Sequence, residues 1–473
     1  MDSRTWPCQQ YNKCGEGETS MSRKSWLIAG STLLAAQMAL AGCSDGTSND
    51  KVSPSASSAA SGTAGSGSGE VTQITLWHME EPPNRVERFN EIIDQFNAAN
   101  PDIKVTAQVQ SWNDAYTKFP AAIQSGNGPD LLFTIPDYTT VIKQLGVVQP
   151  VDDIVKSLDE KHGFLEAAVT PYQYDDHVWA VPAYGMVQVL WYRKDLLDAA
   201  GITPPKTWDE LAEAADKLTT GSQYGIALPA SKSMATDQVL YSFLVTAGAK
   251  NIIDGNNLIT FNSENIVKAY EMYAKLLKDS PADSNTYTWG EPQAQFNAGT
   301  AAMAIEKGQY LSTFEEESGR PSTDLGITTM PVADGGEEGS IYYSNAIMML
   351  TDDSAKQAAI AKFFDYLYDP SNYGNFLNAE PGLFLPVTED GAAEGSSFWS
   401  DPVIAKYKDQ VQVLLDASKN GQLFGFTNGV ASKIGQISGP NYLAQTLEQI
   451  TSKGASAAEA VDWGQNQMEN AVK

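Results

Sequence analysis

The chain of 473 residues carries 31 Lys and Arg against 58 Asp and Glu, a formal net charge of −27, and 42% of its residues are hydrophobic. A chain of this length can bury a large core, in two lobes rather than one, and its negative charge argues against nucleic acid and against charge-driven docking on an anionic membrane. Its three histidines, His78, His162 and His177, are far apart and form no H-E-x-x-H motif, which argues against metal catalysis.

Residues 1–42 are expected to be a signal peptide. The positive pair Arg23-Lys24 follows Met21, and the uncharged stretch Trp26–Leu40 comes next. This stretch is shorter than the roughly 20 residues that a transmembrane helix needs, so it fits a secretory signal better than a membrane span. We expect Met21 to be the true initiator.

The apolar stretch closes on Leu40-Ala41-Gly42-Cys43, which resembles a bacterial lipobox. The resemblance implies that Cys43 is acylated and becomes the mature N-terminus; the alternative is a lone buried cysteine. Because Cys8 and Cys14 precede the signal, the mature chain keeps one cysteine, which excludes a disulfide framework and a thiol nucleophile.

Residues 43–69 are expected to be the lipidated cysteine and a flexible tether. In Ser44–Gly69, 20 of 26 residues are Ser, Gly, Ala or Thr, a composition that cannot bury enough apolar surface to fold. Such a tether has a root-mean-square reach of roughly 25 to 30 Å. The globular body would therefore work close to a membrane.

Strand and helix patterns alternate along that body. Val71–Trp77 and Ile103–Val109 alternate apolar and polar residues, and Asn84–Ala99 carries one apolar helical stripe, so the sequence predicts a β-α-β unit in a parallel sheet. Thr207 and Glu210 match the capping box of a further helix. The other predicted strands are Asp130–Ile135 and Val187–Tyr192, and the other predicted helices are Asn113–Ile123, Lys194–Ala200, Ser263–Lys278, Pro292–Ala298, Ala355–Tyr368 and Tyr442–Ser452. The fold class is therefore α/β.

Several short segments, taken in order, resemble one protein family. They are ITLWH, FNEIIDQFNAANPDIKV, GNGPDLLF, GVVQPVDD, VPAYG, LWYRKDLL, PPKTWDEL and FNAGTAAMAI. From Val71 to Lys473 the chain is similar to the family 1 extracellular solute-binding proteins, the carbohydrate receptors of ATP-binding cassette (ABC) importers.

The resemblance implies a two-lobed periplasmic-binding-protein-like fold, with a ligand cleft between lobes that are joined by hinge strands. The N-lobe is then expected at 71–183 and about 329–388, and the C-lobe at about 184–328 and 389–473. Family likeness also implies that the lobes close on the ligand and that a membrane permease recognises the closed form.

Residues that follow the first-lobe strands are candidates for ligand contact, because parallel α/β sheets bind ligands beyond the carboxyl ends of their strands. Trp77, His78 and Glu80 follow the first strand, although Trp77 fits the core equally well and Glu80 fits a solvated helix start. Asp137 and Tyr138 follow a later strand, and the resemblance places a sugar-contacting acid there. Aromatic rings beside acceptors suit a sugar, which has a C–H face and a rim of hydroxyls.

Further candidates come from the expected crossing between the lobes and from the second lobe. They are Tyr184 at the first hinge crossing, Trp289 before a helix, Tyr310 where relatives place a stacking aromatic, Tyr343 and Asn345 in the return to the first lobe, and Phe426 and Asn428 in the C-terminal region. Expected core residues are Trp191, Trp208, Trp463, Phe363 and Phe364.

No enzyme motif is present: the chain has neither a G-x-S-x-G elbow nor a phosphate-binding loop, although the carboxylate pair of a glycoside hydrolase cannot be recognised from sequence. We predict a lipid-anchored ABC solute receptor, not an enzyme, that captures an oligosaccharide and delivers it to the permease transmembrane subunits. It is expected to be monomeric, to need no cofactor and no nucleic acid, and to sit on the outer face of the cytoplasmic membrane. A peptide or a polyamine is the alternative ligand, because acids beside aromatic rings also hold a cation; a secreted glycoside hydrolase is the less favoured alternative.

Overall fold

Two β-sheets organise residues 71–473, the part of the chain that the computed structural model describes. The larger sheet has six strands in the order β11-β10-β3-β1-β2, with β6 paired to β10, and the smaller sheet has the order β8-β7-β9. The strands of the larger sheet are β1 (Thr72–His78), β2 (Ile103–Val109), β3 (Leu131–Thr134), β6 (Val181–Val187), β10 (Ser340–Met349) and β11 (Gly421–Gln422). Those of the smaller sheet are β7 (Val189–Arg193), β8 (Met303–Glu306) and β9 (Leu325–Thr328), and β4 (Gln173–Tyr174) and β5 (His177–Val178) form a separate hairpin. The expected signal peptide, Cys43 and tether lie outside the described residues.

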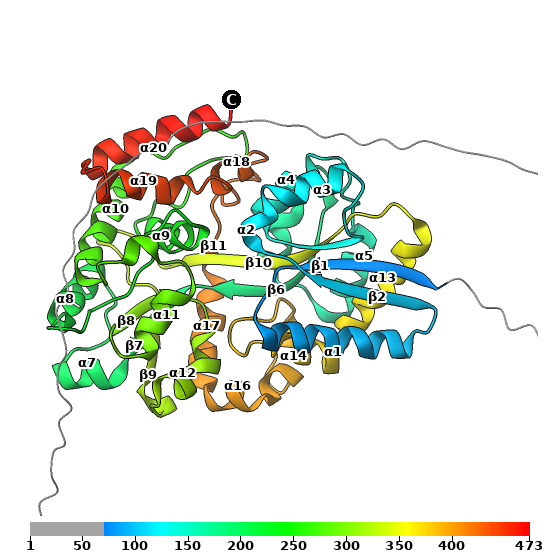
Figure 1. Cartoon of the computed structure of the whole chain (residues 1–473), viewed down its shortest axis with the longest axis horizontal. Coiled ribbons are helices and arrows are strands. Elements are labelled where there is room, and N and C mark those ends of the chain that lie inside the picture. The colour runs from blue at the N-terminus through cyan, green and yellow to red at the C-terminus, as the bar shows by residue number, and fades with distance from the viewer. Residues whose placement is uncertain (1–70) are drawn as a thin grey trace, which may run out of the picture. The chain divides into compact units, whose positions relative to one another are not determined.

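The predicted β-α-β unit is confirmed. β1 pairs in parallel with both β2 and β3, and α1 (Pro83–Ala99) connects β1 to β2. The buried residues of α1 are Phe89, Ile92, Ile93 and Phe96, which are members of the predicted stripe. In Figure 1, α1 and α14 (Pro370–Leu377) lie on one side of the larger sheet, and α3 (Lys118–Gln124) and α4 (Pro136–Lys143) lie on the other.

The second lobe also contains many helices. They include α7 (Lys194–Ala200), α8 (Trp208–Leu218), α9 (Met234–Thr246), α10 (Glu264–Leu276), α11 (Gly290–Asn297), α12 (Tyr310–Ser318), α17 (Lys408–Lys419), α18 (Gly435–Ser438), α19 (Tyr442–Thr451) and α20 (Ala457–Ala471). Of these, α7, α11 and α17 contact the smaller sheet. The remaining helices are α2 (Trp112–Ala115), α5 (Asp152–His162), α6 (Glu166–Val169), α13 (Ser354–Leu367), α15 (Glu389–Ala392) and α16 (Pro402–Lys406). Among residues 71–473, no helix combines the length and the apolar character that a bilayer crossing requires.

Helix ends follow the capping signals of the sequence. Thr207 accepts a hydrogen bond from the Glu210 N–H, and the Glu210 side chain accepts one from the Thr207 N–H, so the predicted capping box is present at α8. Ser456 and Glu459 form a second capping box at α20, which had not been predicted. Each box provides partners for N–H groups that a helix start otherwise leaves free.

Two predicted elements differ from the structure. The predicted helix Asn113–Ile123 is two short helices, α2 and α3, with a break at Tyr116 and Thr117. The predicted strand Val187–Tyr192 is split, because Val187 ends β6 in the larger sheet and Val189 begins β7 in the smaller one.

The chain therefore passes from the larger to the smaller sheet at Gln188, beyond the crossing expected at Pro182–Gly185. Tyr184 lies inside β6, opposite Asn345 of β10. At the crossing, the Gln188 N–H donates to the Ile341 carbonyl at 3.3 Å, and Ser242 of α9 donates to Gln188 Oε1 at 2.9 Å. We propose Gln188 as the first hinge between the lobes.

Most of the expected core residues are buried. Trp191, Trp208, Phe363 and Phe364 are at most 8% exposed. Trp463 is only partly buried, and the Lys453 ammonium lies 5.8 Å from its ring centroid, so this residue lies at the edge of the core.

Candidate functional site

The carboxyl ends of β1 and β3 bring two of the expected acids to the same edge of the larger sheet. Glu80 follows β1, which ends at His78, and Asp137 is in the first turn of α4, directly after β3. Because β1 and β3 are parallel neighbours, their carboxyl ends meet at one edge. Both acids are buried, Glu80 at 6% and Asp137 at 1% exposure.

Asp137 belongs to a buried polar group that we call the aspartate cluster, made of Tyr116, Asp137, Asp237, Gln238, Tyr343 and Ser438. The Tyr116 hydroxyl donates to Asp137 Oδ2 at 2.6 Å. Tyr343 lies near the charges of both Asp137 and Asp237 and accepts a hydrogen bond from Gln238. Residues of this cluster come from the first lobe through α4 and from the second lobe through α9.

Burial is the largest effect on the pKa of Asp137 and on that of Asp237. Loss of solvent raises the pKa of Asp137, and hydrogen bonds from Tyr116 and Ser438 oppose that rise. Burial also raises the pKa of Asp237 well above its ordinary value; the Ala444 N–H opposes this rise, and the charge of Asp137 adds to it. In both aspartates this largest effect favours the neutral carboxyl over an unpaired buried charge.

Several polar atoms in and beside the aspartate cluster are buried without a hydrogen-bond partner in the described structure. They are Asp137 Oδ1, Tyr138 Oη, Thr236 Oγ1, Asp237 Oδ2, Gln238 Oε1 and Asn345 Nδ2. Buried polar atoms normally have partners, and an orphaned one needs an explanation, such as a water molecule, an ion or a ligand that completes its hydrogen bonds. Three of these atoms are carboxylate or amide oxygens, which accept hydrogen bonds. The aspartate cluster therefore favours a ligand that donates hydrogen bonds.

Glu80 belongs to a second polar group, the arginine cluster, made of Glu80, Asn84, Arg85, Tyr184, Ser312 and Glu380. Arg85 contacts Glu80 Oε2 at 2.8 Å through Nη1 and Glu380 Oε2 at 3.2 Å through Nε. The Tyr184 hydroxyl donates to Glu80 Oε1 at 2.6 Å. Protein donors thus engage both oxygens of Glu80, and its role as a ligand contact stays a prediction.

One face of the strand pair β6–β10 carries residues of both clusters. Asn345 lies opposite Tyr184, and Tyr343 lies opposite Met186. Residues opposite each other on antiparallel strands share a face, so Tyr343 of the aspartate cluster and Tyr184 of the arginine cluster lie on the same side of the sheet. Met186 is the one residue of β6 that is not buried.

The other first-lobe candidates are enclosed to different degrees. Trp77 is half-buried, donates to Gln108 Oε1 at 2.8 Å and packs edge-on against Phe119. His78 is fully buried among aromatic rings, with both ring nitrogens lacking a partner. Tyr138 is also fully buried, with its ring 5.1 Å from that of Tyr116.

Trp289 lies near the arginine cluster, as the partly buried residue before α11. The Lys307 ammonium lies 4.0 Å from its ring centroid and 3.2 Å from Glu306 Oε1. Burial lowers the pKa of Lys307, Glu306 opposes this fall, and the charge of Arg85 adds to it. Lys307 therefore connects Trp289 to the charges of the arginine cluster.

The remaining second-lobe candidates are not part of either cluster. Tyr310 is fully buried and stacks on Trp191 at 5.3 Å, with its hydroxyl lacking a partner. Phe426 is half-buried and Asn428 is exposed, in a loop whose Asn428 carbonyl accepts from the Gly255 N–H at 2.9 Å. Their ligand contacts stay predictions.

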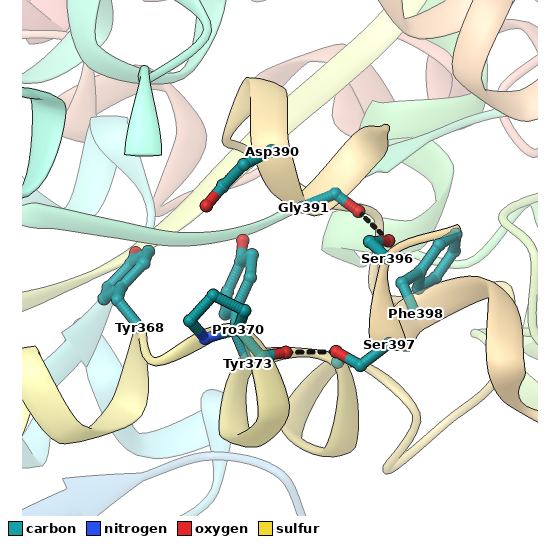
Figure 2. Close-up of a pocket in the computed structure, with 9 residues that line it drawn as sticks. Tyr368, Pro370, Tyr373, Asp390, Gly391, Ser396, Ser397 and Phe398 are labelled. Carbon is teal, nitrogen blue, oxygen red and sulfur yellow. Dashed lines mark hydrogen bonds between the residues drawn. The ribbon is translucent and has the colours of Figure 1, made fainter. Parts of the chain in front are cut away.

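A small cavity lies elsewhere, between α14, α15 and the residues 396–398 (Figure 2). About 10 Å³ of it is accessible to the centre of a water-sized sphere, the lower end of what one water molecule needs. Ser396 donates to the Gly391 carbonyl and Ser397 to the Pro370 carbonyl at its edge (Figure 2). None of the expected ligand-binding residues lines this cavity.

Sequence reasoning missed Asp237, Tyr116 and Arg85. Tyr116 falls at the break between two short helices, and Arg85 reaches Glu380 across 295 positions of sequence. Asp237 could have been suspected as the one charged residue of the segment Met234–Thr246. Within residues 71–473, no group of His, Cys, Asp and Glu side chains is arranged to hold a metal ion.

Comparison with known proteins agrees with this architecture. YcjN of Escherichia coli (strain K12), provisionally named as an ABC transporter periplasmic-binding protein, is 25% identical over 412 residues, which is 85% of this chain and 93% of YcjN. The sn-glycerol-3-phosphate-binding periplasmic protein UgpB of the same strain is 27% identical over 337 residues, 67% of this chain and 75% of UgpB.

Solved structures share the fold at low identity. Maltose-bound T. maritima MalE3 superposes with a TM-score of 0.72 at 17% identity, covering 85% of this chain and 100% of MalE3. The sugar transporter protein of Arthrobacter chlorophenolicus A6 with bound laminaribiose gives a TM-score of 0.71 at 21% identity, with the same coverage. The fold is therefore two-lobed and MalE-like.

A family model described as bacterial extracellular solute-binding protein matches residues 82–373, more than half of the chain. The members of this family are extracytoplasmic binding proteins of transporters. With its two lobes, its buried polar clusters and this match, the chain belongs to the bacterial extracellular solute-binding protein family, as an ABC-type solute-binding protein.

Proposed function

We propose that this ABC-type solute-binding protein captures a neutral oligosaccharide between its two lobes and delivers it to the permease subunits of its importer. The observation that carries the proposal is the set of orphaned oxygens in the aspartate cluster, Asp137 Oδ1 from the first lobe and Asp237 Oδ2 and Gln238 Oε1 from the second. A ligand that donates hydrogen bonds to both lobes favours the closed state, because closure is driven by the difference in affinity between the two states.

Aromatic residues beside the cluster support a sugar ligand. The Tyr138 and Tyr343 rings lie in or next to the aspartate cluster, and sugars pack their C–H faces on such rings. Solved relatives of this fold hold maltose, laminaribiose and maltotriose. Their names and the residue chemistry point to the same class of ligand.

A cationic ligand such as a polyamine is the second candidate, and the paired aspartates favour it. Among the described residues, no Lys or Arg forms an ion pair with Asp137 or Asp237, so an ammonium group would neutralise buried charge that the protein leaves unpaired. The same carboxylates would repel a phosphorylated ligand.

The proposed location rests on the N-terminal sequence. Acylation of Cys43, followed by the Ser/Gly/Ala-rich tether, would hold the receptor at the outer face of the cytoplasmic membrane, close to the permease. The lobe boundaries that we propose follow the sequence expectation, with the first crossing moved to Gln188.

Thermal unfolding in the presence of candidate ligands tests the ligand class. The probes are maltose, maltotriose, laminaribiose, ribitol, spermidine and sn-glycerol-3-phosphate, each followed by mass spectrometry of the recovered compound. A ligand at 100 times its Kd adds about 2.7 kcal/mol to the free energy of unfolding, which raises the midpoint measurably. A sugar that stabilises and is recovered intact supports the proposal, spermidine alone supports the second candidate, and cleaved sugar would replace both with a hydrolase.

Asp137→Asn locates the site once a stabilising probe is found. Loss of a charged hydrogen-bond acceptor costs about 1.5 to 3 kcal/mol, so the Kd measured by calorimetry should rise roughly 10- to 150-fold. The matched control is Asp352→Asn, an exposed aspartate in the loop before α13, which should leave the Kd unchanged. Equal affinities for Asp137→Asn and the control would move the site away from the aspartate cluster.

A further inference from the structure

Asp237 is a second-lobe acid that the sequence did not single out. It lies in the first turn of α9 and is 1% exposed. Its Oδ1 accepts the Ala444 N–H at 2.7 Å, while its Oδ2 has no partner in the described structure. A buried carboxylate with one free oxygen is costly unless something else completes its hydrogen bonds.

One short stretch of the second lobe touches both aspartates. α18 packs on α4, where a hydrogen bond joins Ser438 to Asp137, and α19 packs on α9, where Ala444 binds Asp237. In Figure 1, α18 lies between α19 and α4, so this stretch spans the two lobes. The arrangement brings a carboxyl from each lobe to the same buried region.

Other unpartnered atoms mark this region independently of the acids. Gln238 follows Asp237 in α9 and hydrogen-bonds Tyr343, yet its Oε1 has no partner at 4% exposure. Asn345 lies two residues from Tyr343 on β10, on the same face, and its Nδ2 has no partner at 2% exposure. Together with the two carboxyls, these atoms form a buried group of unpartnered polar atoms rather than a solvated acidic patch.

We propose that Asp137 and Asp237 act as one element with two functions: they bind the hydrogen-bond donors of the ligand from both lobes, and they oppose closure of the lobes when no donor lies between them. This inference rests on the proposed capture by lobe closure. It adds Asp237 as a residue that determines specificity, and it predicts that the empty receptor favours the open state at neutral pH.

The opposition to closure comes from charge. When the lobes close, both carboxylates leave water and approach each other, and like charges in a poorly solvated region repel strongly. Hydrogen-bond donors on the ligand compensate for the lost hydration of the two carboxylates. A proton bound to one of the carboxylates has the same effect. The titratable groups that face the pair are Tyr116 beside α3, Tyr172 before β4, Tyr343 on β10 and Tyr270 on α10, all neutral near pH 7.

The direction of the pH effect follows from burial. Burial in this structure, where residues of both lobes enclose them, raises the pKa of both aspartates above their value in water. Closure then takes up protons, so the closed state is favoured at low pH, and this advantage is lost as the pH rises through the raised values. The unliganded protein should close more readily in acid.

Single-molecule energy transfer between dyes on the two lobes tests the proposal without any ligand. The full chain, with Cys8, Cys14 and Cys43 replaced by serine, is labelled at Asp94→Cys on α1 and Glu213→Cys on α8, two exposed positions. Between pH 7.5 and 5.0 the closed fraction of this protein should rise at least about fivefold. Asp237→Asn and Asp137→Asn should show that raised fraction already at pH 7.5 and respond little to acid.

Matched substitutions keep the result interpretable. Asparagine retains a carbonyl oxygen for the Ala444 N–H, and Asp352→Asn removes an exposed charge elsewhere. Circular dichroism verifies folding of each variant, and Asp137→Asn provides the second test where Asp237→Asn fails to fold. Closed fractions and pH responses of the two variants equal to those of the parent would overturn the inference. Because no ligand is used, this outcome is separate from a failure of the carbohydrate assignment.

Discussion

At the scale of single residues, His78 is the clearest case of a side chain whose position sets its protonation. It is fully buried, its ring contacts Phe89 and Phe133, and neither ring nitrogen has a partner in the described structure. Burial lowers the pKa of His78, and the charge of Glu80 opposes this fall. The imidazole is therefore neutral in the folded protein.

Stability that depends on neutral His78 is present above its ordinary pKa of about 6.5 and is lost as the pH falls below that value. We expect His78→Phe to reduce the pH dependence of the free energy of unfolding between pH 6.5 and 5 by up to about 1.4 kcal/mol per pH unit. Denaturant titrations at four pH values measure this slope. If the free energies of unfolding of the two proteins changed equally with pH, protonation of His78 would not cost stability.

Residue identity predicted candidate-site residues where the sequence shows a clear strand beside them. Asp137 follows a short buried strand, and Tyr343 lies in a long apolar one, so both were recognisable. Asp237 was not, because the helix that carries it, α9, was itself not predicted. The burial of Asp237 depends on α19, whose contact lies 207 positions away in the sequence.

At the scale of elements, the loop after β8 and the loop after α14 pack closely at Gly308 and Gly382. No side chain would fit between the two backbones there. A Cβ on Gly308 would lie 1.9 Å from the Gly382 carbonyl oxygen and 2.9 Å from a Leu414 methyl. Gly382 itself has φ +88°, a conformation that L-residues rarely adopt. The contact joins a loop of the smaller sheet to the segment that pairs Leu385 with Gly185 of the larger one.

Gly308→Ala should therefore lower the free energy of unfolding by about 1 to 3 kcal/mol, the range for forcing extra atoms into a packed site. Gly290→Ala is the matched control, because a Cβ there would meet nothing within 4 Å. Chemical denaturation of the three proteins gives the comparison. Equal losses for both variants would mean that the backbone at Gly308 moves freely.

Elements with a clear period were predicted, and the others were not. α1 and α8 each bury one face, and their stripes and caps are visible in the sequence. α9 was missed because nearly all of its residues are buried, and a helix enclosed on every side shows no amphipathic period. The switch at Gln188 was missed because β6 and β7 read as one apolar strand pattern.

At the scale of the whole molecule, the chain divides into two units in sequence. Gly67–Lys473 forms one compact unit by its internal contacts. Cys43→Ser should move the protein from the membrane fraction to the soluble fraction, since each buried acyl CH₂ contributes about 0.8 kcal/mol to anchoring.

The unfolding midpoint of Cys43→Ser, measured in detergent beside the parent, should stay the same. Cys43 precedes the unit Gly67–Lys473 in sequence, and substitutions away from packed features alter stability by no more than about 0.5 kcal/mol. Membrane retention of the variant would show that the anchor is not at Cys43.

Helix α9 also carries a consequence for how a bound solute is sensed. Asp237 and Ser242 are both on this helix, one in the aspartate cluster and the other bonded to Gln188 at the crossing and to Ser340 of β10. Five residues of helix span about 7.5 Å, less than two turns, and such a rod does not bend over that length. In the proposed mechanism, a ligand that pulls on the Asp237 carboxylate therefore exerts a torque at Gln188, through a lever arm of less than two helical turns.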